Sequence, residues 1–308
     1  MKKLIIAFLL LTIMIVACEP GAEIPEEGVP FIGGTTGLLI SFVEDAPPPE
    51  VYDGGDFPFD IELKLQNEGE RTIKKEDTIV KISGIDPAEF GKTAADFIKN
   101  SPDDLVAKTK DAQGNIIESS PVYVTFADLN HEQLVTGDLN YPIFATACYK
   151  YGTDAISRIC IKENLLEKGG VCEVQGEKPV LNSGAPVQVT SLTESIIGTN
   201  KIRLTFRIEH KGNGRVSKAG TECNKENLRE NMNQVFVSVS TGLPNLECDR
   251  LKEGTGNTGY LRLTDGSAVL SCEQPVTAVG AFLKTVDMKL EYDYEEDVVT
   301  SLIVRHTE

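Results

Sequence analysis

The feature that most constrains this chain is a strict alternation of apolar and polar residues in residues 57–69. Every second position of its first part is apolar: Phe57, Phe59, Ile61, Leu63 and Leu65. Successive side chains of a β-strand point to opposite faces, so this period of two predicts a strand with one buried and one solvated face. Residues 67–69, Asn-Glu-Gly, are typical of a turn.

The same alternation returns 145 positions later in residues 202–214, where Ile202 is in phase with Phe57. A second match, with a shift of 143, relates the Tyr-x-Tyr motif of residues 149–151 to that of residues 292–294. Solenoid repeats have periods of about 20 to 50 residues. A repeat this long therefore predicts two tandem domains.

Other segments have the composition of short strands. They are residues 38–42, 115–117, 122–126, 156–161, 187–192, 235–240, 260–263, 268–270 and 299–304. Polar residues predict turns at 152–154 and 295–297, each closing a hairpin, and at 265–266 between the strands 260–263 and 268–270. Only residues 87–100 show helical spacing and predict one short inserted helix. The pattern as a whole predicts an all-β fold of two tandem immunoglobulin-like β-sandwich domains.

The segment GLLISF, a proline-rich link and DGGDFPFDIELKLQNEG together resemble the CARDB type of immunoglobulin-like domain. GAPVQVTSL followed by IRLTFRIEHKGNG is similar in the second copy, which lacks the three prolines of residues 47–49 and has His210 in place of Leu65. The resemblance covers most of residues 37–308 and extends to uncharacterised prokaryotic, including archaeal, surface lipoproteins with tandem modules. It implies adhesion or display and transfers no catalytic residue.

The N-terminus has the organisation of an export signal. Lys2 and Lys3 precede residues 4–17, which contain no charged residue and are shorter than the stretch of about 20 residues that spans a bilayer. Residues 15–18, Ile-Val-Ala-Cys, resemble a lipobox, which implies cleavage after residue 17 and lipidation of Cys18. Acyl chains would then anchor an extracytoplasmic protein to the cell membrane. The alternatives are an ordinary signal peptide, with Cys18 unmodified, or an uncleaved short anchor.

Composition completes the predicted organisation. Residues 18–36 are rich in Pro, Gly and Glu and predict a flexible tether. The predicted parts are a signal peptide at 1–17, the tether at 18–36, a first sandwich at 37–165, a linker at 166–184 and a second sandwich at 185–308. A net charge of −17 repels nucleic acid, so the expected partners are the membrane, through the anchor, and a protein or surface polymer.

Six further cysteines, an even number in an exported chain, predict disulfides. They are Cys148, Cys160, Cys172, Cys223, Cys248 and Cys272. Cys148 and Cys160 flank the predicted turn at 152–154, where opposite positions of a hairpin lie within disulfide distance. We therefore expect this pair, with Cys248–Cys272 and Cys172–Cys223 as the other two. Cys160–Cys172 is a competing pairing.

The sequence contains no recognisable catalytic motif. The sequence has no HExxH, GxSxG or Walker motif, and no zinc-ligand spacing. The three histidines lie far apart and are expected to be solvated or packed at a rim: His131, His210 and His306. We therefore predict no catalytic residues, no cofactor and no enzymatic activity.

One acidic cluster is a weak calcium candidate. Its members are Asp293, Glu295, Glu296 and Asp297, which the hairpin prediction places at the end of one strand and in its turn. Calcium prefers six to eight oxygen ligands, and carboxylates of a loop can supply several. A solvated strand edge that discourages aggregation is the competing interpretation, and the one we favour.

These observations predict a non-catalytic, membrane-anchored surface lipoprotein that serves adhesion, partner binding or envelope structure. One alternative is a subunit of a surface layer or filament that assembles by pairing exposed edge strands. The other is a solute-binding protein or an enzyme whose site is assembled from scattered polar residues.

Overall fold

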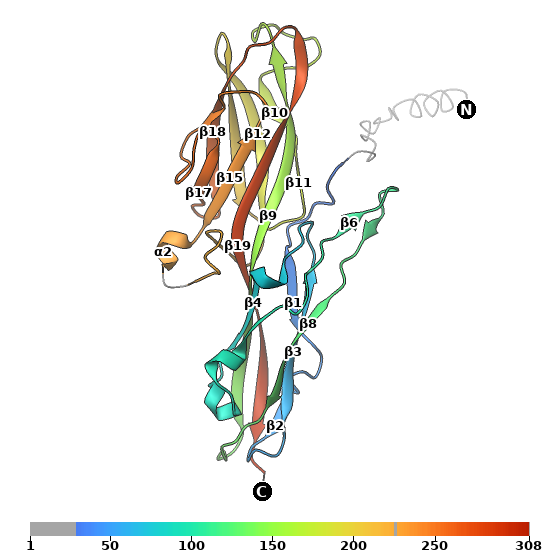
Figure 1. The fold of residues 1–308 in the computed structure, drawn as a ribbon, viewed down its shortest axis with the longest axis vertical. Helices are drawn as coiled ribbons and strands as arrows, with labels where there is room; N and C mark the ends of the chain where they lie inside the picture. Colours follow the sequence, from blue (N-terminus) through green and yellow to red (C-terminus); the bar gives the residue numbers. More distant parts are fainter. Residues whose placement is uncertain (1–28, 225–226, 308) are drawn as a thin grey trace, which may run out of the picture. The chain divides into compact units, whose positions relative to one another are not determined.

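The computed structural model describes residues 29–224 and 227–307, and their regular secondary structure consists almost wholly of β-strands (Figure 1). The predicted all-β fold is confirmed. The chain from Phe31 onward forms one compact unit. The predicted signal peptide and most of the predicted tether lie outside the described residues.

A three-stranded antiparallel sheet contains the alternating segment that the sequence shows first. Its order is β1 (Leu38–Phe42), β3 (Phe59–Asn67) and β8 (Val122–Leu129). In β3 the apolar positions Phe59, Ile61, Leu63 and Leu65 are buried, whereas Phe57 lies before the strand and is exposed. The local alternation therefore correctly identified the buried face of this strand.

A five-stranded antiparallel sheet contains the second copy of the pattern. Its order is β10 (Gly176–Lys178), β12 (Val187–Gly198), β13 (Lys201–His210), β18 (Ser267–Pro275) and β16 (Glu247–Cys248). Strand β13 pairs antiparallel with β12 as β3 pairs with β1. The two repeats thus form the same local strand pair.

The third sheet has nine strands and is organised around two long ones, β9 (Leu139–Lys162) and β19 (Ala281–Arg305). The main path is β17 (Thr258–Arg262), β15 (Gln234–Ser240), β19, β9, β4 (Thr78–Ser83) and β5 (Ile98–Asn100). Strand β11 (Val180–Asn182) pairs with β9, whereas β14 (Arg215–Ser217) and β2 (Glu50–Tyr52) pair with β19.

Strands β9 and β19 are antiparallel partners over nearly their whole length (Figure 1). β9 begins beside β4 of the first repeat and ends beside β11, while β19 begins beside β15 of the second repeat and ends beside β2 of the first. The terminal strand of each repeat therefore continues among strands from the other repeat. The number of domains stays a prediction.

The hairpin turns predicted at 152–154 and 295–297 are wrong, because β9 and β19 run through both segments without a turn. The polar residues there have tertiary partners. The Thr153 hydroxyl hydrogen-bonds to the carbonyl oxygen of Val187, and Glu295 is paired with Arg215. Gly152 leaves room for the opposite strand, since a Cβ atom there would lie 2.5 Å from the Leu290 carbonyl oxygen.

Two smaller predictions also need correction. The strands predicted at 260–263 and 268–270 are present as parts of β17 and β18, but these belong to different sheets and do not pair. The helix predicted over residues 87–100 is instead two 3₁₀ turns, η2 (Pro87–Phe90) and η3 (Ala94–Phe97), followed by β5. Its helical spacing came from Phe90 and Phe97, which the turns bury separately.

The remaining described elements are short. They are η1 (Lys75–Asp77), α2 (Leu228–Asn231), β6 (Thr109–Lys110) and β7 (Ile116–Ile117). Strands β6 and β7 pair antiparallel as a two-stranded hairpin. No helix among the described residues is long and apolar enough to cross a membrane.

Candidate functional site

The predicted lipidation site, Cys18, lies outside the described residues. The other six cysteines form three disulfides: Cys148–Cys223, Cys160–Cys172 and Cys248–Cys272. These bonds indicate an oxidising, extracytoplasmic environment.

Of the expected pairings, Cys248–Cys272 is confirmed, whereas Cys148–Cys160 and Cys172–Cys223 are wrong. Cys148 and Cys160 lie on the same continuous strand, β9. Twelve residues of strand span about 40 Å, far beyond the reach of a disulfide. Without the turn at 152–154, Cys148 bonds to a loop beside the middle of the strand, and Cys160 bonds to a loop near its C-terminal end.

Four buried tyrosines occupy the centre of the β9–β19 pair. Tyr149 lies opposite Tyr294 and Tyr151 lies opposite Tyr292, and all four side chains are fully buried. Neighbouring ring centroids are 5.6 to 6.4 Å apart, within the range of favourable aromatic pairs. These are the Tyr-x-Tyr motifs of the two repeats, brought together by the register of the long strands.

Each of these hydroxyls accepts a hydrogen bond from a backbone N–H group. The donors are Leu38 for Tyr149, Arg71 for Tyr151, Val187 for Tyr292 and Gly214 for Tyr294. Arg71 and Gly214 are themselves 143 positions apart, the shift that relates the tyrosine motifs. The tyrosines therefore hold equivalent chain segments of the two repeats against the shared strand pair, which is a structural role.

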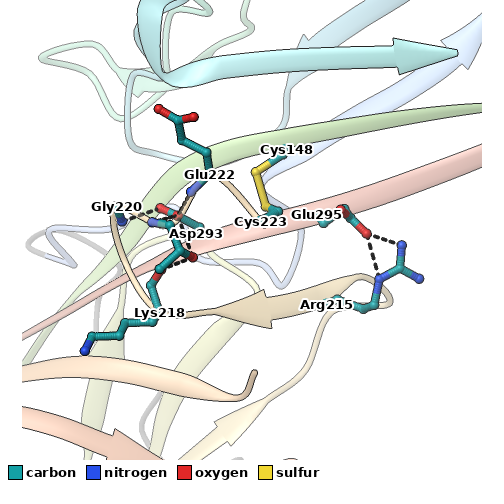
Figure 2. The surroundings of a disulfide bond; sticks show 9 residues. Cys148, Arg215, Lys218, Gly220, Glu222, Cys223, Asp293 and Glu295 are labelled. Carbon is teal, nitrogen blue, oxygen red and sulfur yellow. Dashed lines mark hydrogen bonds and ion pairs between the residues drawn. A yellow bond between two sulfur atoms is a disulfide. The ribbon is translucent and has the colours of Figure 1, made fainter. Parts of the chain in front are cut away.

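The Cys148–Cys223 disulfide fixes a loop beside this centre (Figure 2). Asp293 is buried, and its carboxylate accepts hydrogen bonds from the backbone N–H groups of Gly220, Thr221 and Glu222 at 2.7 to 3.0 Å. Burial raises the pKa of this carboxyl, while the three N–H donors oppose the rise. Disulfide and carboxylate together hold the loop against β9 and β19.

The four acidic residues of the weak calcium candidate lie along strand β19 and have different partners. Asp293 is occupied by the loop, and Glu295 is paired with the Arg215 guanidinium (Figure 2). The same guanidinium lies 3.3 Å from Asp297. Glu296 lies on the opposite face of the strand from Asp293, Glu295 and Asp297, beside Tyr149. Burial raises the pKa of the Glu296 carboxyl to about 7. Among residues 29–224 and 227–307, no group of three or more His, Cys, Asp or Glu side chains is arranged to hold a metal ion.

The histidines also take part in tertiary contacts. His131 is buried against the rings of Phe90 and Tyr141, so the expectation of a solvated or rim position is wrong for this residue. His210 hydrogen-bonds through Nε2 to the Tyr294 hydroxyl at 2.8 Å, and His306 pairs through Nδ1 with Asp53 at 2.8 Å. The three remain in separate parts of the fold.

Sequence reasoning missed a basic groove of about 450 Å³ that strands of two sheets form together. Four cationic residues contribute to its lining: Arg207 on β13, Arg250 and Lys252 before β17, and Arg262 at the end of β17. No aspartate or glutamate is among the described lining residues, although the whole chain has 47 acidic and 30 basic residues. No local sequence signal marks the groove, because its cations come from separate segments.

Comparison with known proteins identifies no family. No family model matches the chain, and no curated protein matches it in sequence. Among solved structures, envelope protein VP37 from White Spot Syndrome Virus is 15% identical, with 47% of this chain and 97% of that chain covered and a TM-score of 0.23.

Two further matches are similarly distant. The secreted serine protease VesC from Vibrio cholerae is 11% identical, with 83% of this chain and 50% of that chain covered and a TM-score of 0.15. A Salmonella alpha-2-macroglobulin mutant is 10% identical, with coverages of 88% and 16% and a TM-score of 0.20. Likenesses this low carry no argument about the function of this chain.

Proposed function

We propose that the protein is a non-catalytic surface lipoprotein, anchored to the membrane by lipidated Cys18, that serves adhesion, partner binding or envelope structure. The observation that carries the proposal is the set of three disulfides. Disulfides persist in oxidising compartments, so an exported chain is expected. The lipobox-like residues 15–18 supply the anchor in this proposal.

The architecture suits a protein that is exposed outside the cell. Three disulfides and a buried tyrosine centre join segments that are distant in sequence. Such cross-links restrict the unfolded chain and stabilise the folded one. The Asp293 and Glu295 carboxylates and the His210 and His306 rings are occupied by structural contacts, which favours display or binding over catalysis.

The chain's N-terminal processing tests the proposal. The full chain is expressed in cells that process lipoproteins, in the presence of a clickable palmitate analogue, beside the variant Cys18→Ser. We expect the parent chain to incorporate the label, to lose residues 1–17 and to be cleaved by protease added to intact cells. The variant should form its disulfides but take up no label. Retention of residues 1–17, or label on the variant, would contradict the proposal.

A further inference from the structure

We propose that the basic groove between β13, β15, β17 and β18 binds an anionic polysaccharide that carries carboxylate groups. This inference rests on the proposed function, since a protein displayed outside the cell meets the polymers of the cell envelope. It names the binding surface and the chemical class of the partner, neither of which the anchor or the disulfides specify.

Three cations of the groove are available to a ligand. Arg250 and Lys252 are exposed, and their side chains make no hydrogen bond or ion pair with the rest of the described chain. Arg207 has one ion pair, to Glu209 at 3.3 Å; the Arg207 side chain is 52% exposed, and the 21% exposed Glu209 also pairs with Lys211 at 2.6 Å. Because Glu209 keeps this second partner, Arg207 can exchange Glu209 for a ligand. Guanidinium groups bind carboxylates through paired hydrogen bonds.

The fourth cation, Arg262, is held in place by the fold. The Arg262 guanidinium donates to the backbone carbonyl oxygens of Arg229, Glu230 and Met232, at 3.0, 2.7 and 3.2 Å. These contacts fix its position without neutralising its charge, since carbonyl groups carry no net charge. Arg262 therefore contributes a fixed positive potential next to the other three cations.

The remaining lining favours a sugar polymer over an acidic peptide. The hydroxyl residues Thr264 and Ser267 lie at the connection between the two sheets, and the ring of Tyr260 lies on β17. Hydroxyl groups can hydrogen-bond to sugar hydroxyls, whereas Lys218 Nζ lies over the Tyr260 ring, 4.6 Å from its centroid, and occupies one of its faces. Apolar lining is limited: Leu261 is buried, which leaves Ala268 and Val269, and Val269 is 39% exposed.

The charge of the rest of the chain gives the groove its selectivity. A chain of net charge −17 repels an anionic polymer over most of its surface. Four cations without a carboxylate in the described lining make this groove a place where such a polymer is attracted (the orange strands β15, β17 and β18 of Figure 1). We therefore expect one preferred site, not a diffuse association.

The test measures binding of the full chain, purified in detergent, to polygalacturonate oligomers by calorimetry. The groove variant combines Arg207→Ala, Arg250→Ala and Lys252→Ala. The matched control combines Arg158→Ala, Lys81→Ala and Lys168→Ala, which removes the same charge from exposed positions outside the groove. Melting temperatures and disulfide content of both variants are compared with the parent to establish that they fold.

We expect the groove variant to bind at least about ten-fold more weakly than the parent, and the control to stay within about two-fold, because each lost contact involves a charged group. Neutral dextran should not bind. Equal weakening of both variants, no binding by the parent, or equally tight binding of dextran, polyglutamate or single-stranded DNA would overturn the proposal. Membrane anchoring is assayed separately through Cys18, so loss of glycan binding and failure of the surface location are distinguishable.

Discussion

Lys150 lies directly opposite Asp293 in the antiparallel register of β9 and β19, and the two residues occupy equivalent positions of the repeat. Equivalent residues that face each other in an antiparallel pair define a local two-fold relation between the repeats. The tyrosines on either side obey it, with Tyr149 opposite Tyr294 and Tyr151 opposite Tyr292. The repeat therefore produces a shared strand pair at the centre of the described chain.

Loss of one hydroxyl from the tyrosine centre should destabilise the fold. Tyr294→Phe removes the hydroxyl that lies 2.8 Å from both the Gly214 N–H group and His210 Nε2, and so leaves each without this hydrogen-bond partner. A buried group without its hydrogen bond costs about 1–3 kcal/mol. Urea denaturation should show this loss, whereas Tyr123→Phe, 47% exposed on β8, should stay within about 0.5 kcal/mol. Equal losses would contradict the assigned role of the hydroxyl.

The disulfide connectivity can be read directly. A non-reducing peptide map should join the peptide of Cys148 to that of Cys223, and the peptide of Cys160 to that of Cys172. Replacing the first pair by alanine should cost about 4 kcal/mol and the second about 3, because the first closes a longer loop, with separations of 75 and 12 residues. A peptide that joins Cys148 to Cys160 would contradict the continuous strand β9.

The free energy of unfolding should decrease as pH rises, because of Glu194. This side chain is fully buried, and burial raises its pKa to about 7, although it accepts from the Cys160 N–H group and pairs with Lys178. Between the ordinary pKa of about 4.5 and the raised value, the folded chain holds a proton that the unfolded chain has released. The free energy of unfolding therefore decreases as pH rises through this window and levels off above it.

Glu194→Gln should remove this contribution. The stability of the variant relative to the parent is expected to increase by roughly 1–3 kcal/mol between pH 4.5 and pH 7.5. Glu177→Gln, at an exposed position of β10, the strand that pairs with the β12 strand of Glu194, provides the control. Urea denaturation at a series of pH values measures both. A relative stability of Glu194→Gln that does not change with pH would refute the assignment.

Glu70 should hold the segment that leads into β1. Its carboxylate accepts from the N–H groups of Ile32, Gly33 and Gly184 at 2.6 to 2.9 Å, so residues 32–33, part of the predicted tether, are bonded to the folded unit. Glu70→Ala removes all three contacts. Limited chymotrypsin digestion should then cleave after Phe31 several-fold faster, as fragment masses would show. Glu44→Ala, at an exposed position, should leave the rate unchanged; equal acceleration would count against the role of Glu70.

Local patterns predicted the strands well where the alternation was regular. The buried faces of β3 and β13 follow from every second residue, since side chains of a strand point alternately to either face. The turns predicted at 152–154 and 295–297 are wrong because a segment of glycine and polar residues can form either a turn or part of a strand. It forms a strand when its polar groups find partners in other segments. Gly152 and Glu295 meet those partners only after folding.

The sequence by itself determined the β character, the repeat and an even number of cysteines for disulfides. Only the tertiary structure decided that β9 and β19 continue through both repeats, that Cys148 bonds to Cys223, and that Arg207, Arg250, Lys252 and Arg262 line one groove. The physical reason is the sequence separation over which each feature is determined. Strand alternation depends on neighbours two positions apart, whereas these features depend on the register between segments that are tens to more than a hundred residues apart.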